Sequence, residues 1–158
     1  MNRIASKILL RMFPALLPFA VRWVESVEAE ILASGTALGE EGVKMVRELG
    51  VAHPEKIRFL KVDSVPLPTN PILRGAARTT GLISPHTVGM AFRYGIMIRS
   101  DWWESGDVQM HECVHTAQYE RLGGVEPFLR EYLRQCLEIG YPEAPLEQEA
   151  ILKSGWPS

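Results

Sequence analysis

The sequence predicts one α+β domain, spanning residues 1–158, in which a small mixed β-sheet packs on a central helix and further helices lie at both ends of the chain. Three observations support this. The composition, 46% apolar and 23% charged, is that of a globular domain with a sizeable core. Short β-prone runs over 57–62 and 94–99 predict strands. Longer segments with apolar residues at spacings of three and four predict helices around them.

The N-terminal segment, residues 1–35, is expected to be helical, because its second half is amphipathic and Gly35 follows as a stop signal. Its first half is an apolar stretch preceded by basic residues, a pattern shared with signal peptides and membrane-surface helices. The basic residues are Arg3, Lys7 and Arg11. Two prolines interrupt the stretch, and no small-residue cleavage site follows. We expect a helix packed on the domain, with a membrane anchor or pro-segment as the alternative.

The next segments alternate between helix and strand signals. Residues 39–49 are expected to form a helix that Gly50 ends. A strand over 57–62 follows, then a proline-rich extended loop over 64–71 and short β-prone runs over 79–92. Together these segments supply three or four strands to the predicted sheet.

The clearest strand covers residues 94–99, directly before the central helix. We expect it to be an edge strand whose unpaired backbone borders the functional cleft and holds an extended substrate. Tyr94 and Ile96 are therefore candidate substrate-binding residues. The alternative is a fully paired interior strand without a binding role.

The central helix carries the most informative motif, His111-Glu112-Cys113-Val114-His115, between N-cap candidates at 105–107 and a glycine stop at 123–124. Four residues make about 400° of helical turn, so both imidazoles lie on one face and can bind one zinc ion. Glu112 stands beside them as a general base for a water molecule. Gln118 lies on the same side and is expected to hydrogen-bond a substrate or a group that orients a ligand.

A catalytic zinc site needs a third protein ligand. A helix over 125–139, broken at 140–142, returns the chain so that a residue early in the last helix, which begins near Pro145, can reach the metal. Glu147 and Glu149 both qualify. They lie roughly 160 to 200° apart on a helix, so only one of them can face the zinc, and spacing alone leaves both open.

The His-Glu-x-x-His motif followed by a Glu-Ala pair on a downstream helix resembles the gluzincin class of zincin metallopeptidases, especially its minimal single-domain forms. The resemblance implies a zincin-like fold and one zinc ion per chain. It also implies His111, His115 and Glu149 as the zinc ligands and Glu112 as the catalytic base. Larger gluzincins carry an aspartate four residues after the third ligand, where this chain has Lys153. No motif identifies the group that stabilises the oxyanion; Tyr141 is one candidate for contact with the substrate.

The expected function is zinc-dependent hydrolysis, with a peptide or protein as substrate. The alternatives are a catalytically inactive metal-binding or structural protein on the same fold, and a membrane-associated partner module that uses the N-terminal helix. A net charge of −2 gives no nucleic-acid footprint. Two cysteines are too few for a disulfide scaffold and indicate a reducing compartment, so we expect a cytoplasmic protein.

Overall fold

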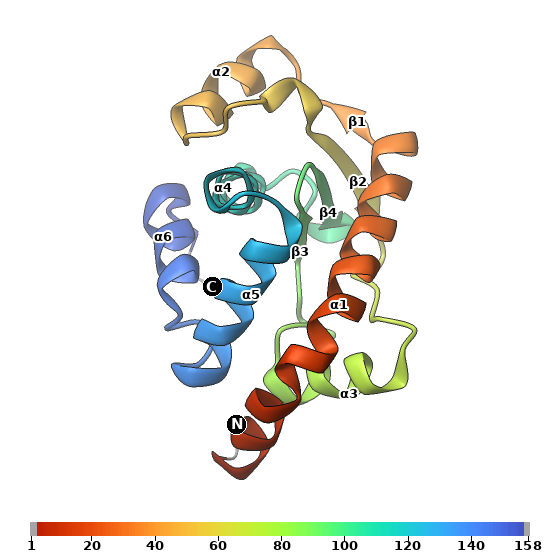
Figure 1. Ribbon diagram of the computed structural model, residues 1–158. Coiled ribbons are helices and arrows are strands. Elements are labelled where there is room, and N and C mark those ends of the chain that lie inside the picture. Colours follow the sequence, from red (N-terminus) through yellow and green to blue (C-terminus); the bar gives the residue numbers. More distant parts are fainter. Residues whose placement is uncertain (1–2, 157–158) are drawn as a thin grey trace.

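The computed structural model describes residues 3–156, which form six α-helices around a four-stranded mixed sheet (Figure 1). The helices are α1 (Arg3–Ser34), α2 (Glu40–Glu48), α3 (Pro71–Thr80), α4 (Gly106–Leu122), α5 (Val125–Glu138) and α6 (Pro145–Ser154). The strands are β1 (Thr36–Ala37), β2 (Arg58–Val62), β3 (Gly89–Phe92) and β4 (Gly95–Arg99). The predicted mixed helix-and-sheet architecture with a small mixed sheet is confirmed.

The strand order is β1-β2-β4-β3, with β4 parallel to β2 and antiparallel to β3. The prediction that residues 94–99 form an edge strand is therefore wrong, because β2 and β3 occupy both sides of β4. Ile96 is fully buried in the core, and the Tyr94 hydroxyl donates a hydrogen bond to Glu120 Oε1 (2.8 Å). Ile96 is therefore closed to a substrate, whereas Tyr94 is partly exposed, and the two edges of the sheet belong to β1 and β3.

The turn between β3 and β4 is held by Glu28, which is buried on α1. The Glu28 carboxylate accepts hydrogen bonds from Arg93 Nε (2.9 Å), Arg93 Nη2 (2.7 Å) and the backbone N–H of Tyr94 (3.1 Å). Arg93 has a φ of 61°, a strained conformation for a residue with a side chain, which these contacts stabilise. Thr116 on α4 donates to the Arg93 carbonyl (2.6 Å). The turn thus fixes β3 relative to both α1 and α4.

α1 packs on the sheet through its second half, where Val24, Val27 and Ile31 are buried. The approach is close at Gly95, where a β-carbon would lie 2.9 Å from Ile31 Cβ. The first half is different. It runs unbroken through two prolines, and α1 is long and apolar enough to cross a membrane by length and composition, with a best 18-residue window of mean hydropathy 1.6 that is only 6% buried.

α3 was missing from the sequence prediction, which placed an extended loop up to Pro71. Asn70 caps this helix, since its Oδ1 accepts hydrogen bonds from the N–H groups of Ile72 (2.9 Å) and Leu73 (3.2 Å). Pro71 occupies the first helical turn, and Gly81 ends the helix with a φ of 75°. The helix signals were therefore present in the sequence, but the neighbouring prolines favoured a loop.

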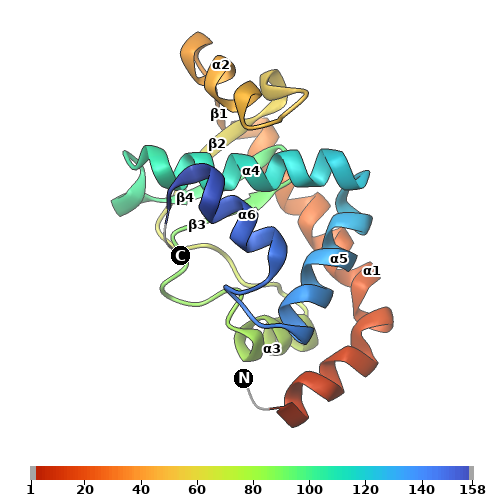
Figure 2. The ribbon, with the colours of Figure 1, turned by 90° about the vertical axis from the view of Figure 1, so that its left-hand side faces the viewer.

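The predicted bounds of the central helix are confirmed. Ser105 Oγ accepts a hydrogen bond from the N–H of Val108 (3.4 Å) at the start of α4, and Gly123 with a φ of 105° ends it. α4 contacts β3 on one side and α6 on another, and α5 joins the two helices (Figure 2). This packing buries the face of α4 that carries the histidines.

Candidate metal centre

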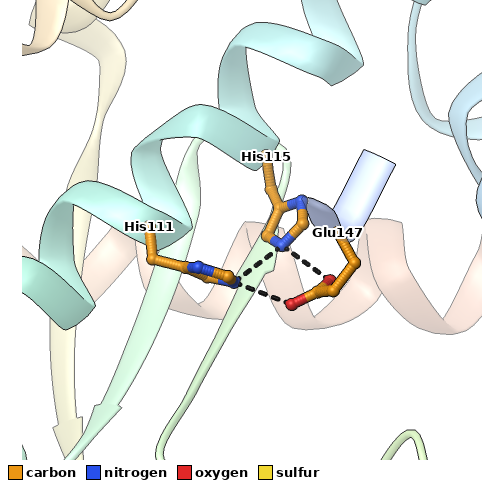
Figure 3. A group of neighbouring side chains, drawn as sticks. All are labelled: His111, His115 and Glu147. Atoms are coloured by element: carbon orange, nitrogen blue, oxygen red, sulfur yellow. Dashed lines mark hydrogen bonds and ion pairs between the residues drawn. The ribbon is translucent and has the colours of Figure 1, made fainter. Parts of the chain in front are cut away.

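Three buried side chains, two from α4 and one from α6, converge on one point (Figure 3). The Nε2 atoms of His111 and His115 lie 3.2 Å apart. Glu147 Oε1 lies 2.9 Å from His111 Nε2, and Glu147 Oε2 lies 3.3 Å from His115 Nε2. These atoms all fall within 4.8 Å of one another, which places two imidazole nitrogens and a carboxylate around a space that one cation can share.

The third member of this cluster is Glu147, so the prediction of Glu149 is not supported by the geometry. Glu149 lies about half a turn away and forms ion pairs with Arg121 (2.7 Å) and Lys153 (2.9 Å). Leu146 and Ala150 are buried against the fold, and Glu147 shares their side of α6. Lys153, which stands where larger gluzincins carry an aspartate, is thereby engaged with Glu149 and not with a histidine.

The donor set fits zinc chemically. Imidazole nitrogen together with a carboxylate is a common ligand set for catalytic zinc, and three protein ligands leave a position for water. Hydrogen bonds with neighbouring residues also orient one of the two histidines, His115, for metal binding. Gln118 Nε2 donates to Leu146 O (2.8 Å) and to Glu149 Oε2 (3.0 Å), so Gln118 Oε1 is the atom that accepts from His115 Nδ1 (2.8 Å). With the proton on Nδ1, His115 Nε2 presents its lone pair to the cluster.

The other two side chains of the cluster, Glu147 and His111, differ in whether a neighbouring residue orients them. The Tyr132 hydroxyl donates to Glu147 Oε2 (2.9 Å), which orients the carboxylate. His111 Nδ1 is buried and has no hydrogen-bond partner within the part of the chain that the structure describes. His115 is therefore the better oriented of the two histidines, and Gln118, expected to contact a substrate or a ligand, contacts His115 and does not line the cavity described below.

Replacement of Gln118 by alanine is expected to weaken zinc binding about 10- to 100-fold, because His115 would lose the contact that sets its tautomer and ring orientation. The affinity is measured by competition with a chromophoric chelator. Gln148→Ala is the matched control, since Gln148 is exposed on α6 and Pro142 O (2.9 Å) is the hydrogen-bond partner that the structure gives its side chain. Equal affinities for both variants and the unchanged chain would contradict the orienting role.

Burial and pairing move the pKa values of the cluster in opposite directions. Burial raises the pKa of Glu147, but hydrogen bonds from His111 and His115 outweigh it and hold this pKa well below its usual range. Burial lowers the pKa of His115, but the hydrogen bond and charge of Glu147 outweigh it, and the net shift is upward. Without a cation, these shifts favour a buried ion pair between ionised Glu147 and protonated His115.

Glu112 lies beside the cluster, at the free edge of β3. A β-carbon at Gly89 would lie 2.9 Å from Glu112 Oε1, so the glycine leaves the space that this carboxylate occupies. Burial raises the pKa of Glu112 above its ordinary value. A carboxylate with a raised pKa is a stronger proton acceptor, which is the property that a general base requires.

The backbone of β3 points its free hydrogen-bonding groups toward this carboxylate. Val88 O accepts from Arg99 N–H (2.8 Å), and bonded and non-bonded pairs alternate along an antiparallel ladder, so Gly89 and Ala91 direct their peptide groups away from β4. Ala91 O is taken by the Tyr119 hydroxyl (3.2 Å). The cavity lining includes Val88, Gly89, Met90 and Ala91, so this stretch of the edge borders the cavity.

A cavity of about 430 Å³ connects the cluster to the outside. Its polar end contains His111, Glu112 and Glu147, and its apolar walls come from α1, α3 and α5. Tyr141, which is 41% exposed, also lines it. Of the four predicted substrate-contacting residues, which were Tyr94, Ile96, Gln118 and Tyr141, only Tyr141 lines this cavity.

The structure thus brings together His111, Glu112 and His115 as the motif predicts, and places Glu147, the alternative to Glu149, beside them. It also adds contacts of Tyr132 and Gly89 that sequence reasoning did not foresee. The apolar neighbours of Glu147 on α6 were a signal for its orientation, whereas nothing in the sequence pairs Tyr132 or Gly89 with the motif. In comparisons with known proteins, no family model, no curated protein sequence and no solved structure matches the chain.

Proposed function

We propose that the protein is a zinc-dependent hydrolase, and specifically a metallopeptidase of zincin-like architecture. One observation carries the proposal: a buried cluster of two imidazoles and a carboxylate lies next to a buried glutamate with a raised pKa, at the polar end of a cavity open to solvent. Metal ligands, a general base and room for a substrate are the parts that hydrolysis of an amide requires.

His111, His115 and Glu147 would hold the zinc ion. Bound there, zinc would supply Lewis acidity toward a carbonyl oxygen and would lower the pKa of a water molecule. Glu112 accepts a proton from the attacking water through its carboxylate and returns it to the nitrogen of the leaving amine. Gln118 and Tyr132 position His115 and Glu147 while this proton moves.

The edge of β3 supports a peptide as the substrate. An extended peptide can add to a free strand edge through backbone hydrogen bonds, and Gly89 brings that edge to the Glu112 carboxylate. Tyr141 lines the same cavity and is the candidate contact for a substrate side chain. The role first expected of β4 is thus transferred to β3.

A structural role without turnover is the competing hypothesis, and one observation favours it. Glu147 already contacts both imidazoles and accepts from Tyr132, so the cluster is internally paired. A buried, hydrogen-bonded ion pair can persist in a core without binding a metal.

Metal analysis separates the two hypotheses. Protein purified without added metal is expected to contain about one zinc per chain, because three protein ligands converge on one point. Dialysis against a chelator should remove the zinc, lower the melting temperature and abolish cleavage of a quenched peptide library, and added zinc should restore all three. A chain that takes up no zinc from a stoichiometric solution would establish the structural role.

A further inference from the structure

The first half of α1 carries an exposed apolar stripe that the proposed hydrolytic site does not explain. Its members recur at spacings of four, four, three and four residues, so they share one face of the helix. They are Ile4, Ile8, Met12, Ala15 and Phe19, all exposed, with Ile4 67%, Ile8 52% and Phe19 50% accessible. An amphipathic helix that only covered a core would turn these side chains inward.

The charges on the segment that carries the stripe and on α3 all have one sign, whereas α5, which also packs on α1, carries both signs and places Glu126 near Pro14 and Pro18. Residues 3–24 contain Arg3, Lys7, Arg11 and Arg22 and no acidic residue. α3, which contacts α1, adds Arg74 and Arg78, and residues 64–100 likewise contain no acidic residue. In a chain of net charge −2, this concentrates cations at one end of the molecule, where both ribbon views place α3 beside the first half of α1 (Figures 1 and 2).

We propose that this end of the molecule docks on the surface of an anionic lipid bilayer, with the stripe of α1 inserted at the headgroup boundary and the basic residues against the lipid phosphates. Exposed apolar side chains flanked by Lys and Arg are the combination that interfacial helices use, since apolar insertion and charge attraction add. The sequence alone offered only the three cations before the apolar stretch; the fold brings α3 and its two arginines to the same end.

α1 lies on the membrane in this proposal and does not cross it. The opposite face of the same segment forms part of the fold, because Leu9, Phe13 and Leu17 line the cavity that α3 and α5 also border. A membrane-spanning α1 would have to leave these neighbours and open the cavity. The uncharged apolar stretch covers only residues 12–21, whereas a spanning helix needs about twenty apolar residues, so a spanning α1 would bury the charge of Arg11 or Arg22 in hydrocarbon.

The docking brings the cavity close to the bilayer with α1 between them, because the stripe and the cavity-lining side chains lie on opposite faces of the same segment of α1. The docking would thereby keep the hydrolytic site near peptides at the bilayer surface. This consequence rests on the proposed hydrolase function, whereas the docking itself does not. The Glu112→Gln variant is therefore expected to bind vesicles as tightly as the unchanged chain.

Co-sedimentation of the full chain with vesicles tests the docking. The chain is expected to bind vesicles of phosphatidylcholine mixed with phosphatidylglycerol, to bind pure phosphatidylcholine far more weakly, and to be released at high salt. Replacing Arg3, Lys7 and Arg11 by glutamine should lower the partition coefficient about a hundred-fold. Ile8→Ser combined with Phe19→Ser should lower it by a comparable factor, because both side chains would no longer insert.

Two exposed apolar residues elsewhere provide matched controls. Met45 on α2 is 51% exposed and Leu152 on α6 is 82% exposed, so serine at these positions should leave vesicle binding unchanged. Circular dichroism and melting temperature establish that every variant is folded. Three outcomes would overturn the proposal: equal binding by stripe and control variants, self-association through α1 without vesicle binding, or retention in the membrane after an alkaline carbonate wash, which marks a spanning helix.

Discussion

Replacement of Glu147 by alanine is expected to abolish stoichiometric zinc binding, weakening the affinity by about a thousandfold or more, because one of three converging ligand atoms is removed. Glu149→Ala is expected to retain zinc, since Glu149 is engaged with Arg121 and Lys153 on the other side of α6. Zinc content by elemental analysis and affinity by chelator competition provide the measurements.

A second variant distinguishes loss of the metal ligand from loss of the folded structure. Glu147→Gln keeps the size of the side chain and an oxygen that Tyr132 can reach, while it removes the anionic ligand. It should therefore melt closer to the unchanged chain than Glu147→Ala does, yet still lose zinc. Retention of zinc by the Glu147 variants together with loss in Glu149→Ala would mean that α6 presents its other face to α4 in the metal-bound protein.

Glu112→Gln is expected to lower kcat for peptide hydrolysis by about a thousandfold or more while the zinc content stays at one per chain. The amide has the shape of the carboxylate but cannot accept a proton, so only the general base is lost. Because Glu112 is not among the converging ligand atoms, its replacement leaves the metal in place. Rates are measured on the best substrate from the peptide library, alongside metal analysis of the same samples.

The control for this variant is Glu104→Gln, which removes one exposed carboxylate just before α4 and should leave both rate and zinc unchanged. A Glu112→Gln protein that keeps its full rate would remove Glu112 from the mechanism. A variant that loses zinc as well would show that the carboxylate supports the metal and does not act on the substrate.

Local signals were sufficient for the helix that carries the motif. Ser105 and Gly123 mark the two ends of α4 through a side-chain cap and a left-handed backbone, and both depend only on residues next to them in the chain. The spacing of His111 and His115 likewise needs only helix geometry to bring the imidazoles together. These features could be predicted because the interactions that produce them are local.

The mistakes arose where distant segments meet. β4 was predicted at an edge because it precedes α4, but β2, more than thirty residues earlier, pairs with it in parallel and makes it interior. The choice of Glu149 followed a resemblance, although Leu146 and Ala150 already marked the buried side of α6. Gln118 was likewise predicted on the face of α4 that carries the histidines. Its hydrogen-bond partners, His115 and Leu146 O, became known only from the packing of α6 on α4.

The sequence by itself determined that one helix presents two imidazoles and a neighbouring carboxylate, that helices flank a small mixed sheet, and that the N-terminal segment is apolar and basic. Only the tertiary structure decided which glutamate joins the histidines, which strand has a free edge, and which cations gather beside the stripe of α1. The physical reason is that periodicity and caps act within a few residues, whereas a ligand cluster, a strand order or a charged surface forms from segments that pack together only in the folded chain.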